Sequence, residues 1–137
     1  MLEQPPLSLY IHIPWCIKKC PYCDFNSHVR KNIDQNLWLN SYLTDIEYHK
    51  NLLAKSKINS IFFGGGTPSL MPPAVIGKII THAENTFGFA PMIEITAEAN
   101  PTSVEANIMT EFYHAGVNRV SMGVQSLDND ILKFLGR

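Results

Sequence analysis

The sequence has no long hydrophobic run, no cluster of basic residues and no cysteine outside one short segment. Its longest apolar runs are only a few residues, too short to cross a bilayer as a helix. The formal net charge is −1 and Lys and Arg are scattered, which argues against a nucleic-acid partner. The first ten residues, MLEQPPLSLY, contain neither a basic nor an apolar signal-peptide region, so we expect a cytoplasmic protein.

All three cysteines lie within eight positions, in the segment CIKKCPYC at residues 16–23. An odd number of thiols cannot close entirely into internal disulfides, and the cytoplasm keeps thiols reduced. Cys16, Cys20 and Cys23 are therefore expected to act as ligands or catalysts rather than as structural bridges.

The remaining chain repeats a strand followed by a helix. We expect strands over residues 7–13, 59–63, 92–99 and 119–125, because these segments alternate in polarity or are short apolar runs. The intervening segments have helical spacing of apolar residues. The stripes are Leu39, Leu43, Ile46 and Leu53; Val75, Ile76, Ile79, Ile80 and Ala83; Val104, Ile108 and Phe112; and Ile131 and Leu135.

The expected helices also carry start and stop signals. The first runs from an N-cap at Asp34 to about Ala54, and Pro72 and Pro73 open the second. A capping box of Thr102 and Glu105 begins the third, with Gly116 as its stop, and Asp128 caps the fourth.

Strands that alternate with helices at this spacing predict a parallel α/β sheet, either doubly wound or part of a (βα) barrel. Three strands carry polar side chains on one face: Tyr10 and His12; Glu94, Thr96 and Glu98; and Ser121, Gly123 and Gln125. A face with polar groups suits a barrel lumen better than a sheet covered by helices on both sides. We therefore predict a partial (βα) barrel of about four units. A complete barrel takes about 250 residues, so residues 1–137 are expected to be the N-terminal part of a larger domain.

The cysteines allow four interpretations. They could be buried small hydrophobes, or structural zinc ligands completed by His12 or His28. Cys20 and Cys23 alone could form a CxxC pair for thiol–disulfide exchange, which leaves Cys16 without a role. A four-iron four-sulfur cluster would use all three thiolates and leave one iron open for a chelating small molecule.

The glycine triplet at residues 64–66 follows the second expected strand. No Lys and Ser/Thr pair follows it, so it is not a phosphate-binding P-loop. It is either a tight turn or, as we favour, a stretch of bare backbone that a ligand approaches closely.

The cysteine spacing CxxxCxxC, with Tyr22 before the last cysteine, resembles the cluster loop of radical S-adenosyl-L-methionine (SAM) proteins. The segments PLSLYIHIPWC, CPYCDFNSH, GGGTPS, AEANP and GVNRVSMGVQS resemble more closely the oxygen-independent coproporphyrinogen III oxidase family, and within it the heme chaperone (HemW) branch. The resemblance extends from Pro6 to Arg137.

This resemblance implies that Cys16, Cys20 and Cys23 hold a four-iron four-sulfur cluster, whose open iron binds the amino and carboxylate groups of SAM. In that family, reductive cleavage of SAM yields a deoxyadenosyl radical. The SAM contacts of the family fall on a wider set of positions in this sequence. They are Tyr10, Tyr22, Gly65, Gly66, Thr67, Glu98, Gln125 and Arg137.

At Phe25 the sequence departs from the oxidases. The family resemblance implies that the oxidases have a further cysteine at this position. This departure favours a heme chaperone, with oxygen-independent coproporphyrinogen III oxidase as the alternative activity and a thiol–disulfide oxidoreductase as a more distant one. The chaperone interpretation implies heme as a further ligand, bound mainly downstream of these residues. It also implies heme-accepting apoproteins and an electron donor as partners, and is compatible with an oligomer and with proximity to a membrane through the heme recipients.

Overall fold

The computed structural model describes residues 5–53, 56–101 and 106–137. Its main sheet has four parallel strands: β1 (Leu7–Ile13), β4 (Ile58–Gly65), β5 (Phe89–Ala99) and β6 (Arg119–Met122). Their order in space is the same as their order along the chain. A doubly wound sheet reverses its order at a switch point, whereas a barrel does not. The α/β fold with a partial (βα) barrel is therefore confirmed.

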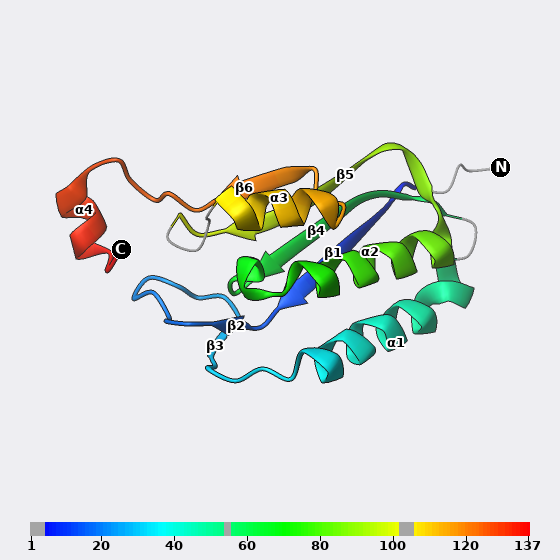
Figure 1. Ribbon diagram of the computed structural model, residues 1–137, viewed down its shortest axis with the longest axis horizontal. Coiled ribbons are helices and arrows are strands. Elements are labelled where there is room, and N and C mark those ends of the chain that lie inside the picture. Colours follow the sequence, from blue (N-terminus) through cyan, green and yellow to red (C-terminus); the bar gives the residue numbers. More distant parts are fainter. Residues whose placement is uncertain (1–4, 54–55, 102–105) are drawn as a thin grey trace.

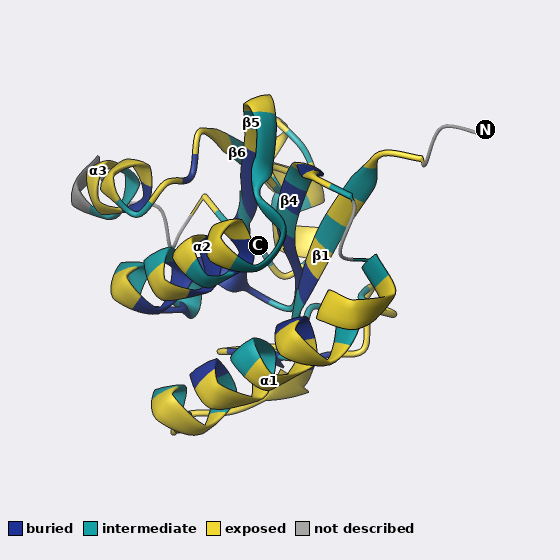
Figure 2. Ribbon diagram, turned by 90° about the vertical axis from the view of Figure 1, so that its right-hand side faces the viewer, coloured by how far each residue is buried: buried dark blue, intermediate teal, exposed yellow. Residues whose placement is uncertain are grey.

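Three helices cover one face of this sheet. They are α1 (Gln35–Leu53), α2 (Pro73–Phe87) and α3 (Ala106–His114), and Figure 2 shows them on the same side of the curved sheet. The short helix α4 (Asn129–Phe134) lies beyond the carboxyl ends of the strands, at the same end as the C-terminus (Figure 1). None of the helices in the described ranges is long and apolar enough to cross a membrane.

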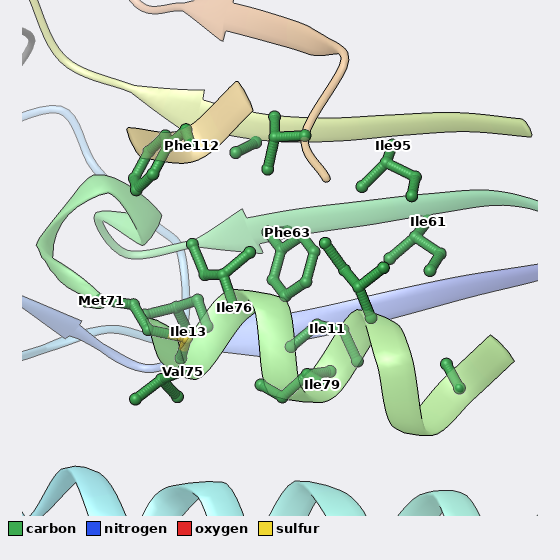
Figure 3. Close-up of a cluster of buried hydrophobic side chains, with 14 of the residues drawn as sticks. Ile11, Ile13, Ile61, Phe63, Met71, Val75, Ile76, Ile79, Ile95 and Phe112 are labelled. Atoms are coloured by element: carbon green, nitrogen blue, oxygen red, sulfur yellow. The ribbon is translucent and has the colours of Figure 1, made fainter. Parts of the chain in front are cut away.

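The hydrophobic core lies between the sheet and α2. Phe63 of β4 is fully buried, and the α2 side chains Ile76 and Ile79 point toward the strands (Figure 3). All five residues of the expected α2 stripe are buried. In α1 only Leu39 and Ile46 are buried, since this helix lies further out and packs on α2. Burial of one strand face leaves the other, with Tyr10, as the open face of the sheet.

The predicted helix starts are confirmed where the chain is described. The Asp34 carboxylate accepts hydrogen bonds from the backbone N–H groups of Asn36 and Leu37, at 3.1 and 3.0 Å. Asp128 caps α4 in the same way, and Pro73 is the first residue of α2. The predicted capping box, Val104 and the predicted helix end at Ala54 lie outside the described residues.

The structure corrects several strand boundaries. β4 continues through Gly64 and Gly65 instead of ending before the glycines, because both remain paired with β1. β5 begins at Phe89 rather than Met92. β6 ends at Met122, three residues early, so Gln125 lies beyond the strand with a φ of 68°. Three short elements were not expected from the sequence: the strands β2 (Trp15–Cys16) and β3 (His28–Val29) and the 3₁₀ helix η1 (Pro68–Leu70).

Candidate functional site

The cysteine loop is closed at its base by a two-residue parallel pairing of β2 with β3. Within the loop, the backbone N–H of Cys23 donates to the carbonyl of Cys20 at 3.0 Å, which makes a turn. All three thiols are free; Cys16 is buried and the other two are half-buried. The loop follows β1 directly and therefore lies at the carboxyl end of the main sheet (Figure 1).

Two side chains hold this loop in place. Lys19 Nζ donates to the carbonyl oxygens of Phe25 and Ser27, at 3.3 and 3.4 Å. His12 Nε2 lies 2.8 Å from the carbonyl oxygen of Asn26, so the loop is also tied to β1. His12, a candidate zinc ligand in the sequence, therefore has a hydrogen-bonding partner that accounts for its position.

The glycine segment crosses close to the end of β1. The backbone N–H of Gly66 donates to the Ile13 carbonyl at 2.6 Å, and that of Thr67 to the Trp15 carbonyl at 2.9 Å. A Cβ at Gly66 would overlap the Trp15 carbonyl, and one at Gly65 would come within 2.7 Å of the His12 ring. Gly65 also has a φ of 110°, which favours glycine. The close passage of two chain segments thus accounts for both glycines before any ligand is considered.

Glu98 joins the ends of two strands. Its carboxylate accepts a hydrogen bond from the Gly65 N–H at 3.2 Å, which connects the carboxyl ends of β4 and β5. Tyr10, on the same open face, stacks on Phe62 with ring centroids 6.0 Å apart. Partial burial raises the pKa of Tyr10, and the negative charge of Glu98 adds to the rise. The carboxylate of Glu98 is therefore close enough to influence the open face as well as the glycine segment.

Arg137 connects the cysteine loop to the end of β5. Its Nε donates to the Tyr22 hydroxyl and its Nη1 to Asn100 Oδ1, each at 2.8 Å. The guanidinium carbon also lies 6.0 Å from the centroid of the Tyr22 ring, within the range of a cation–π contact. Asn100 Nδ2 in turn lies 3.5 Å from Thr67 Oγ1. These contacts link three loops at the carboxyl end of the sheet.

These loops line an open cavity of about 180 Å³, here called the rim cavity. It is lined by all three cysteines and by every predicted SAM-contact residue except Tyr10, which lies on the open face beside it. Asn100, Ser121 and Phe25 also line the cavity and were not predicted as site residues. Asn100 lies in the segment AEANP, directly after a strand with a polar face. That position was the signal by which the sequence could have indicated it as a site residue.

The donor set of the rim cavity fits a four-iron cluster. Within the described ranges, no group of three or more His, Cys, Asp and Glu side chains is close enough to hold one metal ion. A cubane differs from a single ion because each thiolate binds a separate iron, so its ligands surround a volume instead of meeting at a point. Three free thiols on one loop around the rim cavity meet that requirement.

A thiol–disulfide site fits the loop less well. The reactive first cysteine of a CxxC pair is activated by a helix N-terminus. Cys20 lies in a turn between β2 and β3, and no helix begins there.

Comparison with known proteins places these features in a family. Residues 10–137 match the Radical SAM superfamily. The chain is 46% identical to the heme chaperone HemW of Haemophilus influenzae and 44% identical to that of Escherichia coli; it is aligned over its full length and covers 37% and 36% of these relatives. It is 39% identical to the mitochondrial radical S-adenosyl methionine domain-containing protein 1 of Danio rerio, with 95% of this chain and 29% of that protein aligned.

A solved structure shows the same arrangement. Coproporphyrinogen III oxidase (HemN) from Escherichia coli, described as a radical SAM enzyme, superimposes with a TM-score of 0.86 at 31% identity. The match covers 96% of this chain and 31% of that enzyme. The chain thus spans about a third of the length of the proteins it resembles. The match over residues 10–137, together with the parallel sheet and the cysteine loop at its carboxyl end, shows that this chain belongs to the Radical SAM superfamily.

Proposed function

We propose that the chain binds a four-iron four-sulfur cluster through Cys16, Cys20 and Cys23 and binds SAM beside it. The observation that supports this most is that one cavity brings together the three free thiols and the residues after β4, β5 and β6. When bound, the cluster would supply an iron with an open position and a source of electrons for SAM.

The protein's own residues would position SAM around that iron. We propose contacts from Tyr22, Gly65, Gly66, Thr67, Glu98, Gln125 and Arg137 in the rim cavity, and from Tyr10 on the open face. Arg137 and Glu98 have opposite charges and line the same cavity, as the zwitterionic amino-acid part of SAM would require. The bare backbone at Gly65 and Gly66 would let the ligand come close to the end of β4.

We further propose that the complete protein is a heme chaperone that transfers heme to hemoproteins. Two bacterial heme chaperones are 44% and 46% identical to this chain, whereas the oxidase is 31% identical. Phe25 lines the rim cavity with an exposed ring, where the resemblance gives the oxidases a further cysteine. Phenylalanine can neither bind metal nor exchange a proton.

Oxygen-independent coproporphyrinogen III oxidase remains the second candidate, because the solved oxidase superimposes closely on this chain. We also propose that residues 1–137 are the N-terminal part of a radical SAM core domain, because they cover only 37% and 36% of the two bacterial relatives. We propose a cytoplasmic location for the complete protein. Its partners would be heme-accepting apoproteins and an electron donor.

The test uses the complete protein, reconstituted anaerobically with iron and sulfide. We expect close to four irons per chain, a change in the electron paramagnetic resonance (EPR) spectrum on adding SAM, heme binding by absorbance titration, and transfer of that heme to an apo-hemoprotein. Supplied with SAM, a reductant and coproporphyrinogen III, it should form no decarboxylated product. Turnover of coproporphyrinogen without heme binding would establish the oxidase instead.

A further inference from the structure

Asn100 lies where three loops of the rim cavity meet, and the proposed SAM contacts do not include it. It is the residue directly after β5, and Pro101 follows it. A residue before proline is biased toward an extended backbone, so Pro101 restricts the backbone of Asn100. The side chain is half-buried and is directed into the rim cavity between Thr67 and Arg137.

The chemistry of its neighbours fixes the orientation of the Asn100 amide. A guanidinium has only donors, so the carbonyl oxygen of the amide must face Arg137, as the 2.8 Å contact with Oδ1 shows. The NH₂ group then faces Thr67 Oγ1, at the longer distance of 3.5 Å. The contact with Arg137 needs an acceptor, whereas the Thr67 hydroxyl can pair with either a donor or an acceptor.

The same guanidinium reaches the cysteine loop through Tyr22. Tyr22 is 115 positions from Arg137 in the sequence, and Arg137 is 37 positions from Asn100. Arg137 follows helix α4, in which no residue is buried. Asn100 follows Ala99, the buried last residue of β5, and is therefore the better-fixed end of this connection.

We propose that Asn100 is a positioning residue that holds the Arg137 guanidinium against Tyr22 and so keeps the cysteine loop in register with β5. This inference rests on the proposed function, because it assigns the support for the site that binds cluster and SAM. Loss of the Asn100 acceptor would leave a partly buried guanidinium without one of its partners. Such a loss at a charged group weakens an interaction by about tenfold or more.

The first test needs neither cluster nor SAM. In the complete apo-protein, hydrogen–deuterium exchange of the peptide covering residues 16–27 is compared in the wild type, Asn100→Leu and Asn100→Asp. Leucine has a similar size but no polar atom, so the loop should exchange about tenfold faster. Aspartate still accepts from Arg137, and the Thr67 hydroxyl can donate to it, so its exchange should be close to wild type.

Asn118 provides the matched control. Its amide accepts from the Ile95 N–H and donates to the Ile93 carbonyl, both at 2.8 Å, but it does not line the rim cavity. Asn118→Ala should lower thermal stability and leave exchange of the cysteine loop unchanged. Unchanged loop exchange in Asn100→Leu, or equal acceleration in Asn118→Ala, would overturn the inference.

The second test measures SAM affinity by equilibrium dialysis of the reconstituted protein. Asn100→Leu should keep its iron content and bind SAM about tenfold more weakly, with a smaller SAM-dependent change in the EPR spectrum. Wild-type SAM affinity in this variant would refute the positioning role. A wild-type protein that holds no cluster would contradict the proposed function, whereas the exchange experiment would still report on Asn100 itself.

Discussion

The Glu98 carboxylate accepts a hydrogen bond from the Gly65 N–H at 3.2 Å, which joins the carboxyl ends of β5 and β4. The two residues are 33 positions apart in the sequence. The Glu98 carboxylate therefore has two roles. It supports the glycine segment through this hydrogen bond, and it places a negative charge at the rim cavity.

Glu98→Gln and Glu98→Ala separate these roles. Glutamine can still accept from Gly65 but carries no charge, whereas alanine loses both properties. We expect both variants to bind SAM more weakly with unchanged iron content, and only Glu98→Ala to lose thermal stability. In Glu98→Gln the pKa of Tyr10 should fall toward its usual value without reaching it, since burial is the larger cause of its rise. Loss of the cluster together with SAM binding would show that Glu98 is structural.

Serine substitutions at Cys16, Cys20 and Cys23 test the cluster. Each should abolish the visible absorption of the reconstituted protein, because three thiolates leave none to spare. Thermal unfolding of the apo-proteins serves as the control for folding, most importantly for the buried Cys16. A thiol–disulfide enzyme would behave differently: Cys16→Ser would remain active, and Cys20→Ser would not.

Alanine substitutions at a crowded glycine and at an uncrowded one test whether close packing requires glycine in the glycine segment. An added methyl group at Gly66 would overlap the Trp15 carbonyl, so Gly66→Ala should destabilise the protein by about 1–3 kcal/mol. Gly77, inside α2, has its nearest atom at 3.5 Å, an ordinary contact. Gly77→Ala should therefore stabilise the protein by about 0.5–1 kcal/mol through helix propensity. Chemical denaturation measures both; equal effects of the two substitutions would contradict this account.

The partly buried hydroxyl of Tyr42 should make the free energy of unfolding depend on pH in the alkaline range. Its hydroxyl donates to the His12 carbonyl at 2.8 Å, and burial raises its pKa well above the usual value of 10.0. Above about pH 10 the unfolded chain loses this proton while the folded protein keeps it, so the free energy of unfolding falls as pH rises. Tyr42→Phe should reduce that fall and cost about 0.5–1.5 kcal/mol at neutral pH. An identical pH dependence in wild type and variant would contradict the assignment.

Much of the fold could be predicted because its signals are local. The alternation of Leu7–Ile13 predicted β1 with its bounds, and the Asp34 and Asp128 caps marked their helices. Strand ends were less predictable. β4 continues through its glycines because β1 pairs with them, although the apolar run ends before them. β6 ends before Gln125, although the polar and apolar alternation continues to that residue.

The candidate site was predictable to the extent that parallel strands bring their carboxyl ends together. Residues near those ends, such as Glu98 and Thr67, line the cavity with the cysteines. Tyr10 does not, because its side chain lies on the open face further back along β1. Asn100 was missed because its importance lies in contacts with Arg137 and Thr67, which no spacing in the sequence indicates.

The sequence by itself determined the order of the four main strands and their helices, the buried face of β1 and the closeness of three thiols along the chain, since all of these depend on neighbouring residues. Only the tertiary structure decided that Gly66 must pass beside the Trp15 carbonyl and that Arg137 meets Tyr22 across 115 positions. Such contacts depend on how the sheet curves and how its loops meet. They arise from the packing of the whole chain, so the short-range periodicity of the sequence does not indicate them.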